Sequence, residues 1–219
     1  MQRHVQRVYG DDDDTTVHAA NPLASVHLDM GDFSTAMPLR TKALTVAQRV
    51  YGSKHAETLI IKGSLAALHS QMGSPELALF IYIEVLETLR GVLGSENRST
   101  LATMGNIATL YSDMGSDELA LPLHRETLET RRRVLSSQHP GTLYSIFSHG
   151  TTLGVAGDHA AAIPLLEGAL AGLTVMHGPE HPTMRMCQSE LEGIEQCLAN
   201  PPAAAQLLRQ QRLDRQQIN

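Results

Sequence analysis

The feature that most constrains the fold of this chain is a repeat of 42 residues, marked by four columns of identical residues. In chain order these columns are Gly31, Gly73, Gly115 and Gly157; Ala36, Ala78, Ala120 and Ala162; Leu44, Leu86, Leu128 and Leu170; and Thr16, Thr58, Thr100 and Thr142. A fixed period of this length is typical of stacked supersecondary elements, none of which can bury its apolar face alone. The spacing therefore predicts one elongated repeat array rather than two globular domains.

The repeats divide the chain into three parts. Residues 1–10 are the end of a truncated preceding repeat, because HVQRVYG at 4–10 matches VAQRVYG at 46–52; either Met1 is an internal start or the chain is a fragment of a longer array. Residues 11–198 form the array, with repeats at about 16–52, 58–94, 100–136 and 142–178 and a partial one at 183–198. Residues 199–219 contain two prolines and are either a polar capping helix or a frayed tail.

Each repeat has the pattern of two helices. In the third repeat, Leu101, Met104 and Ala108 recur at helical spacing, which predicts a first helix with one apolar face. A left-handed glycine in the glycine column then ends that helix, and Ser116 or Asp117 caps the second one. Alanine in the alanine column is what two helices require where they approach most closely. Because strand-type alternation is absent from the sequence, we expect an all-α fold.

Glycine and proline also mark the breaks between repeats and the starts of the second helices. The second helices are expected to end at Gly52, Gly94 and Gly178, and Pro140 and Pro182 prevent them from continuing. A further proline column lies early in the second helices, at Pro38, Pro122 and Pro164, with Phe80 in its place in the second repeat. We interpret these prolines as structural.

Composition excludes several classes of partner. The formal charge is −6, which argues against nucleic-acid binding because phosphate contacts need clustered Lys and Arg. The basic cluster at residues 131–133 is interpreted as a solvated helix end that favours the C-terminal dipole. No stretch of the sequence approaches a membrane span, and no apolar signal segment is visible, so we expect no membrane partner and a cytoplasmic location.

The sequence offers little support for metal sites or catalysis. Cys187 and Cys197 form no CxxC pair, so neither a metal site nor a disulfide framework is indicated. The string from His177 to His181 reads as a zinc-peptidase motif, but its Gly-Pro pair breaks the helix that such a motif needs. The aspartates at 11–14 lack the distal Glu of an EF-hand and are interpreted as a solvated linker. We therefore expect no enzyme activity, no catalytic or metal-binding residues and no cofactor.

The repeat resembles a known family. The strings AMPLRTKAL (36–44), ALPLHRETL (120–128) and AIPLLEGAL (162–170), together with the linker HPGTL (139–143), are similar to tetratricopeptide repeats of the long, kinesin light chain-like type. The resemblance covers about residues 4–198. It implies a right-handed α-solenoid of antiparallel helix pairs. The chain departs from the family in two respects: Asn106 alone remains of the paired asparagines, and Gly150 and Gly154 weaken the first helix of the fourth repeat.

The resemblance also implies where a ligand binds. In tetratricopeptide arrays the first helices line a concave groove. The residues that matching the repeat places there include eight candidate contacts: Gly63, Ala67, Gln71, Asn106, Thr109, Asp113, Tyr144 and Phe147. This surface is small, polar and mildly acidic. It lacks the Lys, Asn and Arg set with which chaperone-binding relatives hold a terminal carboxylate, so recognition of such tails is disfavoured.

These observations favour a protein-interaction scaffold or adaptor that binds a peptide segment in the groove. The alternative is a structural array that flanks an effector domain outside this chain, such as an NTPase, a kinase or a motor subunit. A third class, a hydrolase using the His177 to His181 string, would require bound zinc. The identity of the protein or peptide partner and the oligomeric state do not follow from the sequence.

Overall fold

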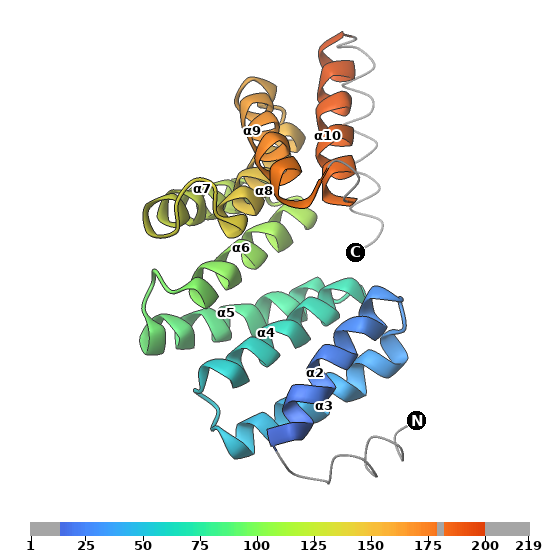
Figure 1. The fold of residues 1–219 in the computed structure, drawn as a ribbon, viewed down its shortest axis with the longest axis vertical. Helices are drawn as coiled ribbons and strands as arrows, with labels where there is room; N and C mark the ends of the chain where they lie inside the picture. Colours follow the sequence, from blue (N-terminus) through green and yellow to red (C-terminus); the bar gives the residue numbers. More distant parts are fainter. Residues whose placement is uncertain (1–13, 179–181, 200–219) are drawn as a thin grey trace. The chain divides into compact units, whose positions relative to one another are not determined.

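The computed structural model describes residues 14–178 and 182–199, and within these ranges the regular secondary structure is helical, as predicted (Figure 1). The helices in chain order are α2 (Asp14–Asp29), α3 (Phe33–Val50), α4 (Ala56–Gln71), α5 (Pro75–Leu93), α6 (Arg98–Asp113), α7 (Asp117–Val134), α8 (Pro140–Ala156), α9 (His159–His177) and α10 (Pro182–Ala199). They belong to two compact units, Met1–Thr103 and Met104–Asn219, and the boundary falls within α6.

In the first unit, α2 packs on α3, α3 on α4, and α4 on α5. Two clusters of buried side chains hold these helices together. One contains Val17, Ala20, Ala43, Val46, Ala47 and Ile61. The other contains Leu59, Val85 and Leu89. The first cluster joins both helices of the first repeat to α4 of the second, so these two repeats bury apolar area against each other, as a stacked array requires. The second cluster joins α4 and α5 within the second repeat.

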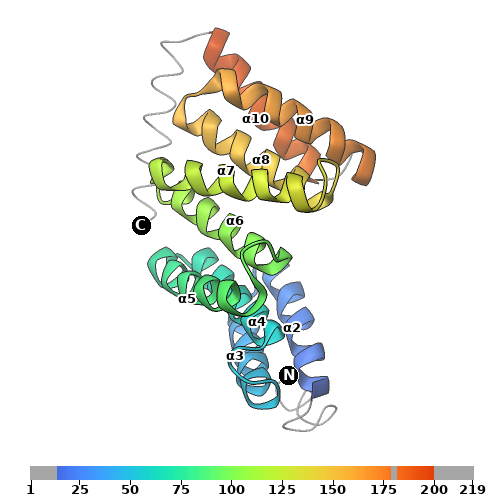
Figure 2. The same cartoon turned by 90° about the vertical axis from the view of Figure 1, so that its left-hand side faces the viewer.

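In the second unit, α8 packs on α7 and α9, and α10 packs on α9 and α8 (Figure 2). The main buried cluster contains Leu128, Leu143, Ile146, Ala169, Leu173, Met184 and Cys187. A second one contains Ala162, Leu166 and Ile194. The partial fifth repeat, through α10, therefore covers the apolar face of the fourth.

The glycine column ends the first helices as predicted. Gly31, Gly73, Gly115 and Gly157 have φ values of 73°, 76°, 74° and 91°. The same pair of backbone hydrogen bonds recurs at each glycine, one from the glycine and one from the residue after it. In the first repeat the N–H of Gly31 donates to the carbonyl of Leu28 (2.9 Å), and the N–H of Asp32 donates to the carbonyl of His27 (2.8 Å). This is the Schellman arrangement, in which a left-handed residue satisfies the last carbonyls of a helix.

The second helices end in a second column of positive φ. Gly52, Gly94 and Gly178 have φ values of 90°, 88° and 80°, which confirms the predicted stops. The third repeat has Ser136 in this column, and its φ is 98°. A side chain in this backbone region is strained, because only glycine adopts it freely.

The linker histidines cap the first helices. His55 Nδ1 accepts a hydrogen bond from the backbone N–H of Glu57 (3.2 Å), and His139 Nδ1 accepts one from Gly141 (3.0 Å). In the linker between them along the sequence, Asn97 Oδ1 accepts from Ser99 in the same way (2.9 Å). This column is therefore structural, because a side-chain acceptor satisfies a free N–H at each helix start.

The alanine column marks close helix contacts. All four of its members, Ala36, Ala78, Ala120 and Ala162, are 0% exposed. Two glycines of α8 serve the same purpose: a Cβ added to Gly150 would lie 3.0 Å from Leu166 Cγ, and one added to Gly154 would lie 2.9 Å from Ile194 Cδ1. The sequence interpretation, in which these glycines only weaken a helix, was therefore incomplete, since each permits a close packing contact.

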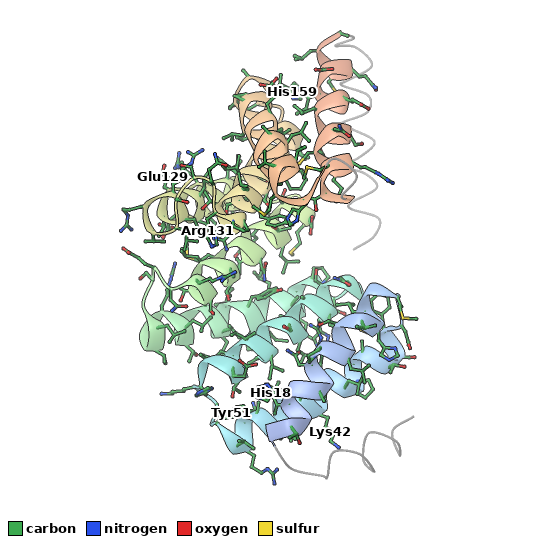
Figure 3. All side chains as sticks on the ribbon, viewed as in Figure 1. His18, Lys42, Tyr51, Glu129, Arg131 and His159 are labelled. Atoms are coloured by element: carbon green, nitrogen blue, oxygen red, sulfur yellow. The ribbon has the colours of Figure 1, made fainter. Side chains whose placement is uncertain are left out.

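The basic cluster at residues 131–133 is only partly solvated, which corrects the sequence interpretation. Arg131, labelled in Figure 3, is half-buried, and its Nη1 donates to the carbonyl oxygen of Gly141 (2.7 Å) and to Ser145 Oγ (2.6 Å). Arg132 and Arg133 are exposed. One arginine of the three thus ties α7 to the start of α8.

The helix α9 differs from another sequence expectation. Among the described residues it is long and apolar enough to cross a membrane, judged by length and composition only. Its members Ala162, Leu166, Ala169 and Leu173 are 0% exposed and pack into the clusters of the second unit. A single such helix is weak evidence for a membrane span, because the core helix of a soluble protein passes the same test of length and composition.

Candidate binding surfaces

Three of the predicted groove residues lie on α4 in the first unit. Gly63 and Ala67 are half-buried, and Gln71 is exposed. A Cβ added to Gly63 would lie 3.9 Å from Tyr82 Cε1, so this glycine sits in ordinary contact with α5. Neighbouring Lys62 pairs with Glu84 of α5, at 2.5 Å between Nζ and Oε1. In this unit the predicted surface is therefore mostly neutral and small.

Three more lie on α6, in the part that belongs to the second unit. Asn106, Thr109 and Asp113 are all exposed. Their spacing of three and then four residues puts them on one face of the helix. We call these three residues the α6 strip. The strip presents an amide, a hydroxyl and a carboxylate to solvent, so it can both donate and accept hydrogen bonds.

The last two lie on α8, where they differ in environment. Tyr144 is 37% exposed, and its hydroxyl lies 3.4 Å from His177 Nε2 of α9. Phe147 is half-buried and packs against both buried clusters of the second unit. Tyr144 is therefore open to a ligand, whereas much of Phe147 is used in packing. Which residues contact a ligand stays a prediction.

The zinc-peptidase string does not form a continuous helix. The helix α9 ends at His177, and Gly178 follows it with a φ of 80°. The rest of the string, Glu180 and His181, lies outside the described residues, as do residues 1–10, the aspartates at 11–13 and the tail from residue 200. Within the described part of the chain, no group of three His, Cys, Asp or Glu side chains could hold a metal ion.

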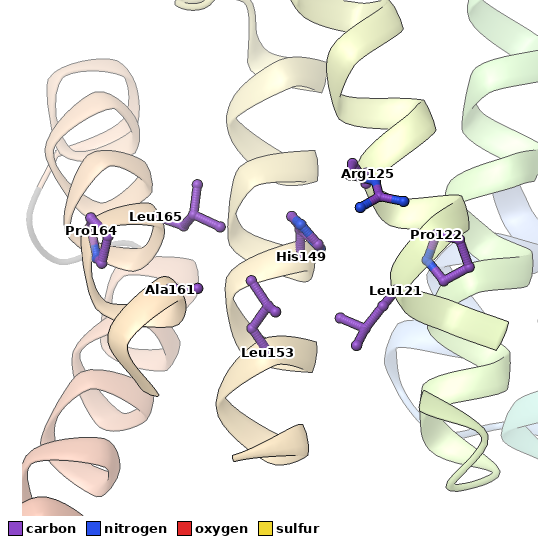
Figure 4. Close-up of a pocket in the computed structure, with 8 residues that line it drawn as sticks. All are labelled: Leu121, Pro122, Arg125, His149, Leu153, Ala161, Pro164 and Leu165. Atoms are coloured by element: carbon purple, nitrogen blue, oxygen red, sulfur yellow. The ribbon is translucent and has the colours of Figure 1, made fainter. Parts of the chain in front are cut away.

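The structure also contains a hollow that the sequence interpretation missed. It lies between the second helices α7 and α9, over the first helix α8, and has a volume of about 650 Å³ (Figure 4). Its lining residues are Leu121, Pro122 and Arg125 of α7, His149 and Leu153 of α8, and Ala161, Pro164 and Leu165 of α9. We call these residues the α7–α9 hollow. A volume of this size suits a bulky apolar side chain or a short segment.

The hollow combines a histidine that is neutral at neutral pH, His149, with the positive charge of Arg125. Burial lowers the pKa of His149, and the neighbouring positive charges of Arg125 and Arg132 lower it further, against an opposing effect of Glu129. Its ring lies near that of His124 on α7, with centroids 6.3 Å apart. Burial lowers the pKa of His124 to about 4, with a further contribution from His149. At neutral pH Arg125 is therefore the charged group of the lining.

Two sequence signals could have located the hollow. Pro122 and Pro164 belong to the proline column, interpreted above as structural only, and the structure places both in the wall. His149 occupies a column that holds Leu65 and Ile107 in the two preceding repeats. A polar residue in an apolar column is a local inconsistency, and such inconsistencies concentrate at functional or strained sites.

The fold and these surfaces define a helical repeat protein of the kind used for binding. Models of the tetratricopeptide repeat match residues 15–91 and 100–141, together more than half of the chain. The chain therefore belongs to the tetratricopeptide repeat family. A search of curated protein sequences finds no match.

Solved structures with this fold include kinesin light chain-like proteins. A candidate kinesin light chain from Podosopora anserina, with nearly identical TPR-like repeats, matches at 24% identity and a TM-score of 0.66, over 91% of this chain and 94% of that chain. A single-substitution variant of it matches at 24% identity and a TM-score of 0.67, over 90% of this chain and 93% of that chain. BtubC (BKLC) from P. vanneervenii matches at 22% identity and a TM-score of 0.64, over 82% of this chain and 71% of that chain. At this identity the likeness shows the fold, which is that of the kinesin light chain-like repeats.

Proposed function

We propose that this chain is an interaction scaffold that binds a peptide segment of a partner protein along the first helices α6 and α8 of its second unit, with the α6 strip as the main polar contact. Tetratricopeptide repeats generally mediate protein–protein interaction, and proteins built from them are typically scaffolds rather than enzymes. The observation that carries the finer proposal is the exposure of Asn106, Thr109 and Asp113 on one helical face.

Asn106 is the best single contact for a peptide backbone. A peptide group presents one donor and one acceptor, and a side-chain amide matches both at once. Its neighbours on the strip favour a particular charge on the partner: Asp113 is acidic and the chain as a whole carries a formal charge of −6. A neutral or basic segment is therefore favoured over an acidic one, because like charge slows encounter and costs affinity.

The test uses the intact chain in two steps. Proteins captured by the immobilised chain are identified, and overlapping peptides of each are screened to find the shortest segment that binds. The affinity of that peptide is then measured by titration calorimetry for the wild type, Asn106→Ala and Glu129→Ala. Glu129 is a matched control because it is an exposed polar residue of the second helix α7.

We expect Asn106→Ala to weaken binding about fivefold or more, which corresponds to roughly 1 kcal/mol for a lost hydrogen bond. Glu129→Ala should leave the affinity unchanged. The opposite pattern would place the interface on the second helices and refute the proposal.

A further inference from the structure

The α7–α9 hollow is not part of the proposed peptide site, and its lining shows what it can accept. Six of its eight residues are aliphatic or proline, and its charged group is Arg125. It is framed by two second helices, whereas the α6 strip lies on a first helix. Its chemistry fits a bulky apolar side chain accompanied by a carboxylate. The apolar side chain would cover the aliphatic lining, and the carboxylate would pair with the arginine beside it.

The first unit of the same chain exposes a surface with this chemistry. On α5, Leu77, Phe80 and Ile83 are 45%, 67% and 40% exposed, and their spacing of three residues arranges them along a slowly turning ridge. We call these three residues the α5 ridge. Phe80 stands in the column that holds proline in the other three repeats, so a small ring is replaced by a projecting aromatic one.

Acidic side chains accompany the ridge. Glu76, Glu84 and Glu87 are exposed on the same helix, and Glu84 is paired with Lys62. The ridge thus combines apolar area with negative charge, while the hollow combines apolar area with the positive charge of Arg125. Such complementarity of charge around apolar contacts is what orients two surfaces on encounter.

We propose that the α5 ridge of one copy docks into the α7–α9 hollow of a second copy, with Phe80 between the leucines of the hollow and a ridge glutamate facing Arg125. The two surfaces differ, so the contact is heterologous: the copy that supplies the ridge keeps a free hollow, and the copy that supplies the hollow keeps a free ridge. Association therefore continues from copy to copy until a free ridge and a free hollow of the same assembly close on each other. One ridge in one hollow is a small interface, so the association is weak and reversible.

Sedimentation velocity of the intact chain tests this proposal. From roughly 1 µM to 1 mM the average mass of the wild type should rise steadily with concentration. Phe80→Asp and Arg125→Glu should each remain monomeric. Val175→Asp is the matched control, because Val175 is an apolar residue of α9 that is 90% exposed and lies outside the lining; it should associate like the wild type.

Mixing the two defective variants gives the decisive result. Phe80→Asp retains an intact hollow and Arg125→Glu an intact ridge, so an equimolar mixture should form a one-to-one complex that grows no further. Both substitutions replace exposed side chains, and far-UV circular dichroism checks that the helices are retained.

A wild type that stays monomeric over the whole range overturns the proposal, and so does a mixture that forms no complex. Unchanged association of Phe80→Asp also overturns it. If the chain is monomeric and a different protein binds the hollow, the occupant assigned here is wrong even though the hollow is used.

Discussion

Two glycines of α9 provide a controlled test of how closely the helices of the second unit approach. Gly172 and Gly168 lie about one turn apart on the same helix, five and nine residues before its last residue, so both are in the helix interior. A Cβ added to Gly168 meets nothing within 4 Å. A Cβ added to Gly172 would lie 2.5 Å from Leu143 Cδ2, 3.0 Å from Cδ1 and 3.3 Å from Cγ.

The two substitutions to alanine should change the free energy of unfolding in different directions. Alanine in a helix interior is favoured over glycine by about 1 kcal/mol, and Gly168→Ala should gain most of this. Gly172→Ala gains the same amount but must displace Leu143, which is 2% exposed within a packed cluster. Overpacking of this kind costs roughly 1–3 kcal/mol, so Gly172→Ala should be destabilising or at best neutral. The two variants should differ by roughly 1–3 kcal/mol.

The assay is urea unfolding monitored by circular dichroism. Free energies of unfolding are compared between variants whose dependence on urea concentration, the m value, is the same. A third and a fourth variant, Leu143→Ala with and without Gly172→Ala, complete a double-mutant cycle. Once Leu143 is shortened, Gly172→Ala should become stabilising, because the contact that opposed it is gone. If Gly172→Ala stabilises the wild type as much as Gly168→Ala does, the close approach of α8 and α9 is refuted.

Three further predictions follow from single positions. Ser136→Gly should raise the free energy of unfolding by about 1 kcal/mol, because it relieves a side chain at a φ of 98°; an unchanged urea midpoint would contradict this. Ala120→Leu should lower it by roughly 1–3 kcal/mol through overpacking at a residue that is 0% exposed, and the same midpoint measures it. The folded pKa values of His124 and His149 are depressed, so the stability that they provide is complete above pH 6.5 and is lost as pH falls towards about 4. His124→Leu, which copies Leu166 in the next repeat, should flatten stability measured against pH, and an unaltered profile would exclude His124 as a cause.

The helix boundaries could be predicted from the sequence because they depend on local chemistry. Glycine at Gly115 or Gly178 supplies a backbone conformation that other residues avoid, so the residue type itself indicates the stop. The stop at Ser136 could not be read in this way, since a serine gives no such indication. There a side chain occupies a backbone conformation that only glycine adopts freely, so the stop is strained.

The contacts between helices could not be predicted from the sequence in the same way. The role of Gly154 depends on Ile194, forty residues later in the sequence, and that of Gly172 depends on Leu143 on another helix. Helix propensity predicts only that these glycines destabilise their helices. It contains no information about the neighbouring side chains that leave no room for a Cβ. The α7–α9 hollow was missed for the same reason, because its lining comes from three helices and forms only when they pack side by side.

We propose above that a partner segment lies along the first helices α6 and α8. Hydrogen–deuterium exchange of the intact chain, with and without the bound peptide identified by capture, tests it without any substitution. We expect slower exchange in α6 and α8 when the peptide is bound, with α7 and α9 unchanged. Slower exchange confined to α7 and α9 would contradict it.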